Sequence, residues 1–329
     1  MFSPFDSIDD KIEKLTEKLK KLETLIGDES YVIYFTPTSV KRYVELVIKK
    51  QTEKKSYYFP VNEKDFDRYF NKIDPHFNYK LLKYNPSSNL EIISKIIANQ
   101  GISGYSYLEN IERVINLNKP TLMFYGIEQI SAFFRNLYFN FTDENTEYNP
   151  IKRRFQRHGI NSSDFKNIDI EISLDDLLEK KIQLKLEGFC PLFFLIFLSD
   201  HRSTLIDLFI DEAEISLGEL LRNFFYLRYE HIPGLIRSKF EESFGKERPK
   251  IHLDSIVLTI YLIIFLFSHI SRYKMHTWIS LIESNERNIS YYIDFIMKYG
   301  RVIFIKLLFK RLFFNEMGIG GTLHDSLLS

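Results

Sequence analysis

The stretch PTLMFYGIEQISAFF, residues 120–134, decides the fold class that the sequence predicts. Pro120 suits the first turn of a helix, where a missing N–H costs nothing. Apolar side chains then recur at helical spacing, at Met123, Ile127, Ile130, Phe134 and Leu137. Gly126 lies inside this run, and because a glycine within a helix costs about 1 kcal/mol relative to alanine, it indicates close packing against another element.

Polar residues of the same helix share its other side, namely Glu128, Ser131 and Arg135. The pattern therefore predicts a core helix with one solvated face. The alternative is a polar stripe that faces a ligand.

Composition sets the class of protein around this helix. The chain has 329 residues, 45% of them hydrophobic, which is enough for two domains or one large one. Basic and acidic residues number 44 each, so no overall field draws the protein to nucleic acid or to an acidic membrane, and any such contact must be local. The lone Cys190 excludes an intramolecular disulfide and a cysteine-rich zinc site. We expect a cytoplasmic protein with no metal and no cofactor.

The strongest membrane candidate is IVLTIYLIIFLF at residues 256–267, closely bracketed by Asp254 and His269. A span needs about 20 apolar residues, so this segment predicts a helix buried on all sides and no membrane association. The first residues, MFSPFDSIDDK, lack the basic and then apolar order of a signal peptide.

Residues 7–26 form an N-terminal heptad helix, which we treat as a separate unit at 1–27. Its apolar residues alternate steps of four and three, at Ile8, Ile12, Leu15, Leu19, Leu22 and Ile26. Ser7 with Asp10 resembles a capping box, and Gly27 can end the helix. Three heptads are marginal alone, so this coiled-coil segment either docks on its own body or pairs with a partner or a second copy.

The remaining chain predicts a mainly α, multi-helix globular protein with a small β element. We divide it into a helical region with that β element at 28–245 and a C-terminal helical region at 246–329, since the charged run before Pro249 reads as a linker; the two could equally form one domain. Helical patterns occupy residues 39–50, 65–73, 90–99, 192–198, 205–210, 217–229, 277–283 and 291–314, and residues 107–117 lead into the helix at 120–134. Extended patterns occupy residues 31–35, 56–61, 168–172 and 182–186, the last two around a helical turn at 174–178.

The order of short motifs resembles the bacterial YaaC-like family from about Tyr34 to Phe314. The segments are NLEIISKIIAN, YLENIERVINLNKPTLMFYGIEQ, RRFQRHGI and HISRYKMHTW. The family-like positions are Pro120, Tyr125, Gly126, Gln129, His158, Gly159, Arg272, Tyr273 and Trp278. The heptad helix lies outside this pattern. The resemblance implies no particular reaction.

The densest basic cluster comprises Lys152, Arg153, Arg154, Arg157 and His158, and no acidic residue lies between Tyr148 and Ser163. Guanidinium groups beside a glycine suit the phosphate of a nucleotide or of RNA. The alternative is a solvated basic loop, or one paired with acids elsewhere in the fold.

The spacing of Arg153 and His158 resembles the Arg-x4-His motif of HEPN ribonucleases, which implies RNA cleavage without metal in a defence or toxin setting. An ordered helix carrying both residues would favour this enzyme, and an exposed loop would disfavour it.

A second polar and aromatic group follows the apolar segment and contains Arg272, Tyr273, Lys274, His276 and Trp278. Arg272 can bond the last carbonyls of the helix, and Trp278 can anchor the packing. The alternative for Arg272, Tyr273 and Trp278 is to stack on or grip a ligand. Motifs such as HExxH, GxSxG and a phosphate loop are missing from the sequence. The sequence thus favours a binding or sensor protein over an enzyme, with the ribonuclease and a scaffold that pairs through residues 7–26 as alternatives.

Overall fold

The computed structural model describes residues 40–41, 44–45, 47–49, 53, 90–139, 160–169, 172–184, 213–227, 234–245, 253, 255–284 and 289–314. Within these ranges the protein is mainly α-helical with a small antiparallel sheet, which confirms the predicted fold class. The heptad helix at 7–26 lies outside the described residues, as do the patterns at 31–35, 56–61, 65–73, 192–198 and 205–210. The division near residue 246 stays a prediction.

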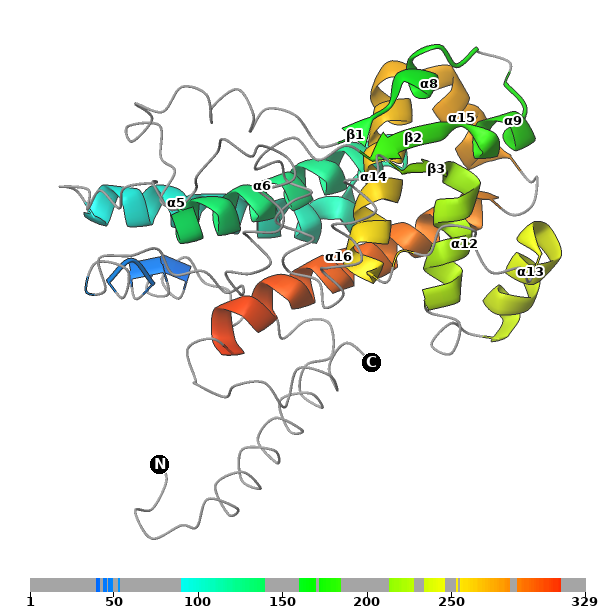
Figure 1. Ribbon diagram of the computed structural model, residues 1–329. Helices are drawn as coiled ribbons and strands as arrows, with labels where there is room; N and C mark the ends of the chain where they lie inside the picture. The colour runs from blue at the N-terminus through cyan, green and yellow to red at the C-terminus, as the bar shows by residue number, and fades with distance from the viewer. Residues whose placement is uncertain are drawn as a thin grey trace, which may run out of the picture.

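Two long helices, α5 (Leu90–Glu109) and α6 (Lys119–Phe139), lie side by side (Figure 1). Glycines on both helices meet at their contact. A Cβ atom at Gly126 would lie 3.0 Å from Leu108 Cδ2 and 3.2 Å from the carbonyl oxygen of Gly104. A Cβ atom at Gly104 would lie 3.0 Å from the carbonyl oxygen of Gly126. The close approach predicted at Gly126 is therefore confirmed, and it involves backbone on both helices.

The predicted solvated face of α6 is wrong. Ser131 is buried, Glu128 and Arg135 are half-buried, and Tyr125 is exposed. The reason is that α5, α14 and α16 all pack against α6, so several sides of this helix are covered.

Helix α14 (Ile256–Tyr273) forms the centre of the core and is tied at its start to α12 (Leu217–Leu227). The Ser255 hydroxyl accepts a hydrogen bond from the Leu258 N–H, at 3.2 Å. The buried Asn223 amide donates to the Leu253 carbonyl at 3.0 Å and to Thr259 Oγ1 at 2.8 Å. These bonds satisfy polar groups that burial would otherwise leave without partners.

Among the described helices, α14 is the one long and apolar enough to cross a membrane by length and composition. Most of it is buried within the protein, as predicted, and the central helix of a globular core meets the same criteria. Its last residue, Tyr273, is exposed, so the helix opens to solvent only as it ends.

The sheet has the order β1-β2-β3 and is antiparallel throughout, with β1 at Ile160–Asn161, β2 at Lys181–Leu184 and β3 at Glu214–Ser216. The predicted strand at 168–172 is wrong, since Ile168, Asp169 and Ile172 are not extended in a sheet and the Ile172 N–H donates to the Asp169 carbonyl in a turn. The predicted helical turn is confirmed as α9 (Leu174–Glu179), capped by the Ser173 hydroxyl. A short helix, α8 (Ser163–Lys166), connects β1 to this region and packs on α14.

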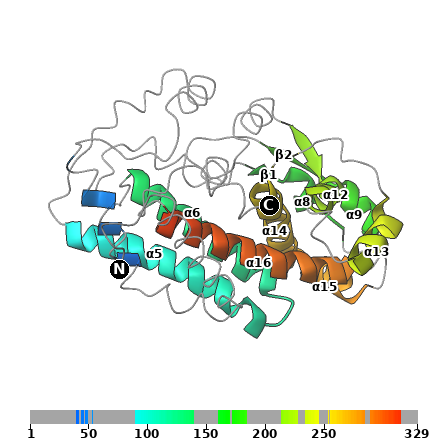
Figure 2. The ribbon, with the colours of Figure 1, turned by 90° about the horizontal axis from the view of Figure 1, so that it is seen from below.

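The C-terminal half adds α13 (Gly234–Phe244), α15 (Met275–Glu283) and α16 (Ile289–Phe314). Figure 2 shows α16 running along α5 and α6 and reaching α15 near the sheet. The sequence patterns predicted α12, α15 and α16 within a few residues, whereas α13 was missed.

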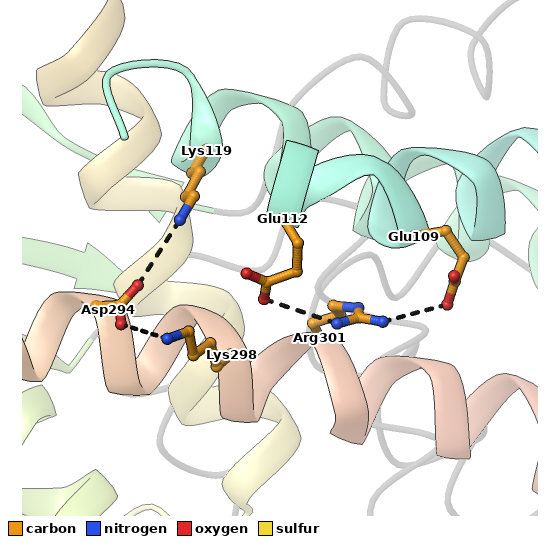
Figure 3. A network of polar contacts seen from close by, with 6 residues as sticks. All are labelled: Glu109, Glu112, Lys119, Asp294, Lys298 and Arg301. Carbon is orange, nitrogen blue, oxygen red and sulfur yellow. Dashed lines mark hydrogen bonds and ion pairs between the residues drawn. The ribbon is translucent and has the colours of Figure 1, made fainter. Parts of the chain in front are cut away.

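An ion-pair network, drawn in Figure 3, fastens α16 to α5, to α6 and to the 3-10 turn η2 (Asn110–Arg113). Arg301 Nη2 lies 3.5 Å from Glu109 Oε1, and Arg301 Nη1 lies 3.6 Å from Glu112 Oε1. Lys119 Nζ lies 3.7 Å from Asp294 Oδ1, and Lys298 Nζ lies 2.8 Å from Asp294 Oδ2. We call these six residues the α16 clamp.

Candidate functional site

The structure describes only one of the two groups of predicted site residues. Lys152, Arg153, Arg154, Arg157 and His158 lie outside the described residues, so their predicted phosphate contacts and the catalytic alternative stay predictions. The described chain resumes at Ile160, two residues after His158, and α8 then packs on α14. Arg272, Tyr273 and Trp278 are all described.

Arg272 lies in the last turn of α14, held by a carbonyl and three aromatic rings. Its Nε donates to the Ser268 carbonyl at 3.1 Å, which is the helix-end role that the sequence allowed. Its Cζ lies 5.1 Å from the ring centroid of Phe124, 5.7 Å from that of Tyr125 and 5.2 Å from that of Tyr273. Nη1 also lies 3.4 Å from the Tyr125 hydroxyl. Cation–π contact with several rings fixes the guanidinium without neutralising it.

Three cations around this point have no carboxylate partner among the residues that the structure describes. Within the described part of the chain, Arg272, Lys166 and Lys274 form no ion pair with an aspartate or glutamate. Lys166 comes from α8, and Lys274 is the single residue between α14 and α15. Positive charge from two distant parts of the sequence therefore gathers at the end of α14.

His269 lies within this accumulation of charge. Its ring lies 6.4 Å from that of Phe265 and 4.9 Å from that of Tyr273. Burial lowers the pKa of His269, and the positive charges of Arg272, Lys166 and Lys274 lower it further. The imidazole is therefore neutral at pH 7 and offers one hydrogen-bond donor and one acceptor.

Exposed aromatic rings flank the cations. The exposed fraction is 64% for Tyr273 and 42% for Tyr125, although both rings rest on buried or half-buried rings beneath them. We call the whole surface the cation–aromatic face; its residues are Tyr125, Lys166, His269, Arg272, Tyr273 and Lys274. Such a surface can attract an anion and stack against a planar group.

The first turn of α15 adds donors beside Lys274. The residue at its N-cap is Lys274 itself, whose side chain cannot accept a hydrogen bond from the backbone, and no side-chain cap is present. The first N–H groups of a helix have no partner within that helix and favour negative charge. This end of α15 strengthens the positive potential of the cation–aromatic face.

Trp278 does not belong to that face. It is fully buried, and its ring packs 5.5 Å from Phe267 between α15 and α14. Its side chain lines a cavity of about 40 Å³, which is too small to hold a nucleotide. Of the two roles that the sequence left open, packing is the one that its position supports.

An acidic hollow of about 1010 Å³ lies beside α8 and α9. It is lined by Asp164, Asn167, Ile168, Asp169, Ile172, Asp176, Glu179, Lys180 and Lys181. Among the described residues, no three histidine, cysteine or acidic side chains stand close enough together to hold a metal ion. This hollow therefore carries no metal chemistry that we can assign.

Sequence patterns pointed to Arg272 and Tyr273 but not to Lys166 and His269 as their partners. The signal for His269 was present, since Phe265, His269 and Tyr273 follow one another at helical spacing on one face of α14. Lys166 had no such signal, because its approach to α14 depends on tertiary packing.

Searches against family models, curated proteins and solved structures found no match for this chain. The resemblance to the YaaC-like family thus rests on its short motifs alone.

Proposed function

We propose that this protein is a non-catalytic binding or sensor protein of the cytoplasm, similar to the YaaC-like family, that recognises a phosphate-bearing ligand. One observation carries the proposal: Arg272, Lys166 and Lys274 all act on His269 and form no ion pair with a carboxylate among the described residues, in a chain whose net charge is zero. In such a chain, local excess charge indicates an anionic partner.

The basic loop, residues 152–158, is the second part of the proposed site. It adds four cations and a histidine, and Lys166 follows His158 by only eight residues. A ligand with several phosphates, either a nucleotide or RNA, suits charge contributed by two neighbouring segments.

Each group has a chemical task in this proposal. The guanidinium of Arg272 offers N–H groups in a fixed plane, which matches two oxygens of one phosphate. Lys166 and Lys274 act as mobile point charges that neutralise the remainder. Nothing in this arrangement requires a bond to be made or broken, and binding alone would be read out by a partner.

The test is binding of a fluorescently labelled single-stranded RNA and of ADP in EDTA, over a range of salt concentrations. Arg153→Ala with Arg157→Ala should weaken RNA binding and flatten its salt dependence, by about 0.7 in slope for each phosphate that the variant no longer neutralises. The matched control is Lys95→Ala with Lys239→Ala, which removes the same charge from exposed positions on α5 and α13. Unchanged binding in the double arginine variant would remove the basic loop from the site.

The other two functions stay predictions. Arg153 and His158 as a ribonuclease pair require RNA cleavage in EDTA that His158→Ala abolishes, and the absence of cleavage in the parent protein would end that hypothesis. Self-association through residues 7–26 requires a lower mass in light scattering when these residues are deleted.

A further inference from the structure

We infer that the cation–aromatic face selects a nucleoside phosphate, with the base stacked on Tyr273 and Tyr125 and the phosphate held by Lys166, Arg272 and Lys274. This inference rests on the proposed function and names the class of ligand. It concerns the described residues alone.

The two exposed tyrosines are placed for stacking. Both lie within reach of the same guanidinium, since Arg272 Cζ is 5.2 Å from the ring centroid of Tyr273 and 5.7 Å from that of Tyr125. Two open rings beside one cation form a platform of the kind that holds a base next to its own phosphate.

Buried rings hold this platform in place. Tyr273 packs on His269, which packs on Phe265, and Tyr125 packs on Phe124 at 5.8 Å between centroids. Phe124 and Phe265 are themselves buried and lie 5.9 Å apart. Ring contacts that already exist before the ligand arrives reduce the entropy that is lost on binding.

The neutral His269 suits the sugar between base and phosphate. A ribose hydroxyl both donates and accepts hydrogen bonds, and so does a neutral imidazole. A purely phosphate-binding surface would gain nothing from exposed rings, which otherwise leave apolar area in water. The combination of open rings, a neutral histidine and cations that form no ion pair within the described residues therefore points to a whole nucleotide.

The experiment is isothermal titration of the full chain in EDTA with AMP, ribose 5-phosphate and hexaadenylate. AMP and ribose 5-phosphate share the phosphate and differ by the base, and hexaadenylate distinguishes RNA from a free nucleotide as the source. The variants are Tyr273→Leu, Tyr273→Phe and Lys166→Ala. Matched controls are Tyr291→Leu, a similarly exposed tyrosine on α16, and Lys95→Ala.

We expect Tyr273→Leu to weaken AMP binding by about 5- to 150-fold, the range for one stacked base, and to leave ribose 5-phosphate unchanged. Tyr273→Phe keeps the ring and should bind AMP as the parent does. Lys166→Ala should weaken both ligands, and the two controls neither. If only hexaadenylate binds, the same weakening in Tyr273→Leu supports the inference with RNA as the source.

Equal affinity for AMP and ribose 5-phosphate, or full AMP binding in Tyr273→Leu, overturns the nucleoside inference and leaves phosphate binding intact. If hexaadenylate alone binds and Tyr273→Leu does not change that binding, the inference is also overturned. Failure of all three ligands to bind the parent overturns the proposed function as well.

Discussion

Arg301 and Arg272 lie on two neighbouring long helices, and they contact different kinds of chemical group. Arg301 reaches two carboxylates, Glu109 at 3.5 Å and Glu112 at 3.6 Å, within the α16 clamp. Arg272 reaches a carbonyl and three aromatic rings, and no carboxylate among the described residues. Ion pairing in the clamp therefore serves stability, whereas the charge at the end of α14 remains open to a ligand.

This difference predicts how substitutions divide between the two regions. Changes in the clamp or at the glycine contact between α5 and α6 should lower the free energy of unfolding and leave ligand affinity alone. Changes on the cation–aromatic face should mainly lower ligand affinity, with smaller effects on stability.

The largest effect should come from the glycine contact between α5 and α6. Gly104→Leu places a Cβ atom only 3.0 Å from the carbonyl oxygen of Gly126 and from the backbone nitrogen of Ile130, so the two helices must separate. We expect a decrease of about 3 kcal/mol or more in the free energy of unfolding, measured by urea denaturation. Ser103→Leu adds similar bulk at an exposed neighbour and should cost far less. Equal decreases in both variants would show that α5 and α6 are not packed through Gly104.

A matched pair of conservative changes tests the comparison directly. In Arg301→Lys, one compact ammonium replaces the guanidinium that contacts both carboxylates. This variant should lower the free energy of unfolding by about 1 kcal/mol and leave nucleotide affinity unchanged. Arg272→Lys keeps the charge but removes the planar fork, so it should weaken AMP binding about tenfold with a smaller change in stability. If both variants change stability and affinity alike, the two regions are not functionally distinct.

Alkaline pH should act on the clamp through Tyr105. Burial, and then the negative charge of Glu109, raise the pKa of Tyr105 to about 12. Since the unfolded tyrosine ionises near its ordinary value of about 10, the stability due to this residue is complete below pH 10 and is lost as the pH rises toward 12. Tyr105→Phe should therefore show a shallower fall in stability between about pH 9 and pH 11 in urea denaturation. A slope equal to that of the parent would contradict this assignment.

Acid pH should act on the cation–aromatic face through His269, with the smallest effect. The pKa of His269 is lowered by burial and by Arg272, Lys166 and Lys274, so the unfolded chain takes up the proton more readily. Stability due to this residue is complete above about pH 6.5 and falls as the pH drops through the lowered folded value. His269→Gln should therefore be destabilised less than the parent by a change from about pH 7.5 to pH 5.5, as measured by urea denaturation. An identical fall would contradict a lowered pKa for this imidazole.

Local sequence patterns predicted the helices well because their signals repeat along one segment. The pattern at 90–99 stopped short, however, and α5 continues to Glu109. Gly101 and Gly104 weakened the signal there, yet their small size is what the packing requires, since a Cβ atom at Gly101 would lie 2.9 Å from the Phe133 ring. The same glycines that obscure a helix in the sequence allow it to pack.

Pairings between distant segments could not be predicted. The strand β2 was predicted, but its partners Ile160–Asn161 and Glu214–Ser216 were missed, because strand pairing depends on contacts far apart in the chain. The candidate site shows the same limit: Arg272 and Tyr273 stood out in the sequence, but Tyr125 and Lys166 reach them only after α6 and α8 have packed on α14.

Trp278 gives the protein a built-in optical reporter. It is the single tryptophan of the chain, and its ring is enclosed where α15 packs on α14. One residue, Lys274, separates those helices and also belongs to the cation–aromatic face. Tryptophan emission therefore reports on the contact between α14 and α15. Time-resolved fluorescence after rapid mixing with ligand would reveal whether this contact and the cation–aromatic face move together.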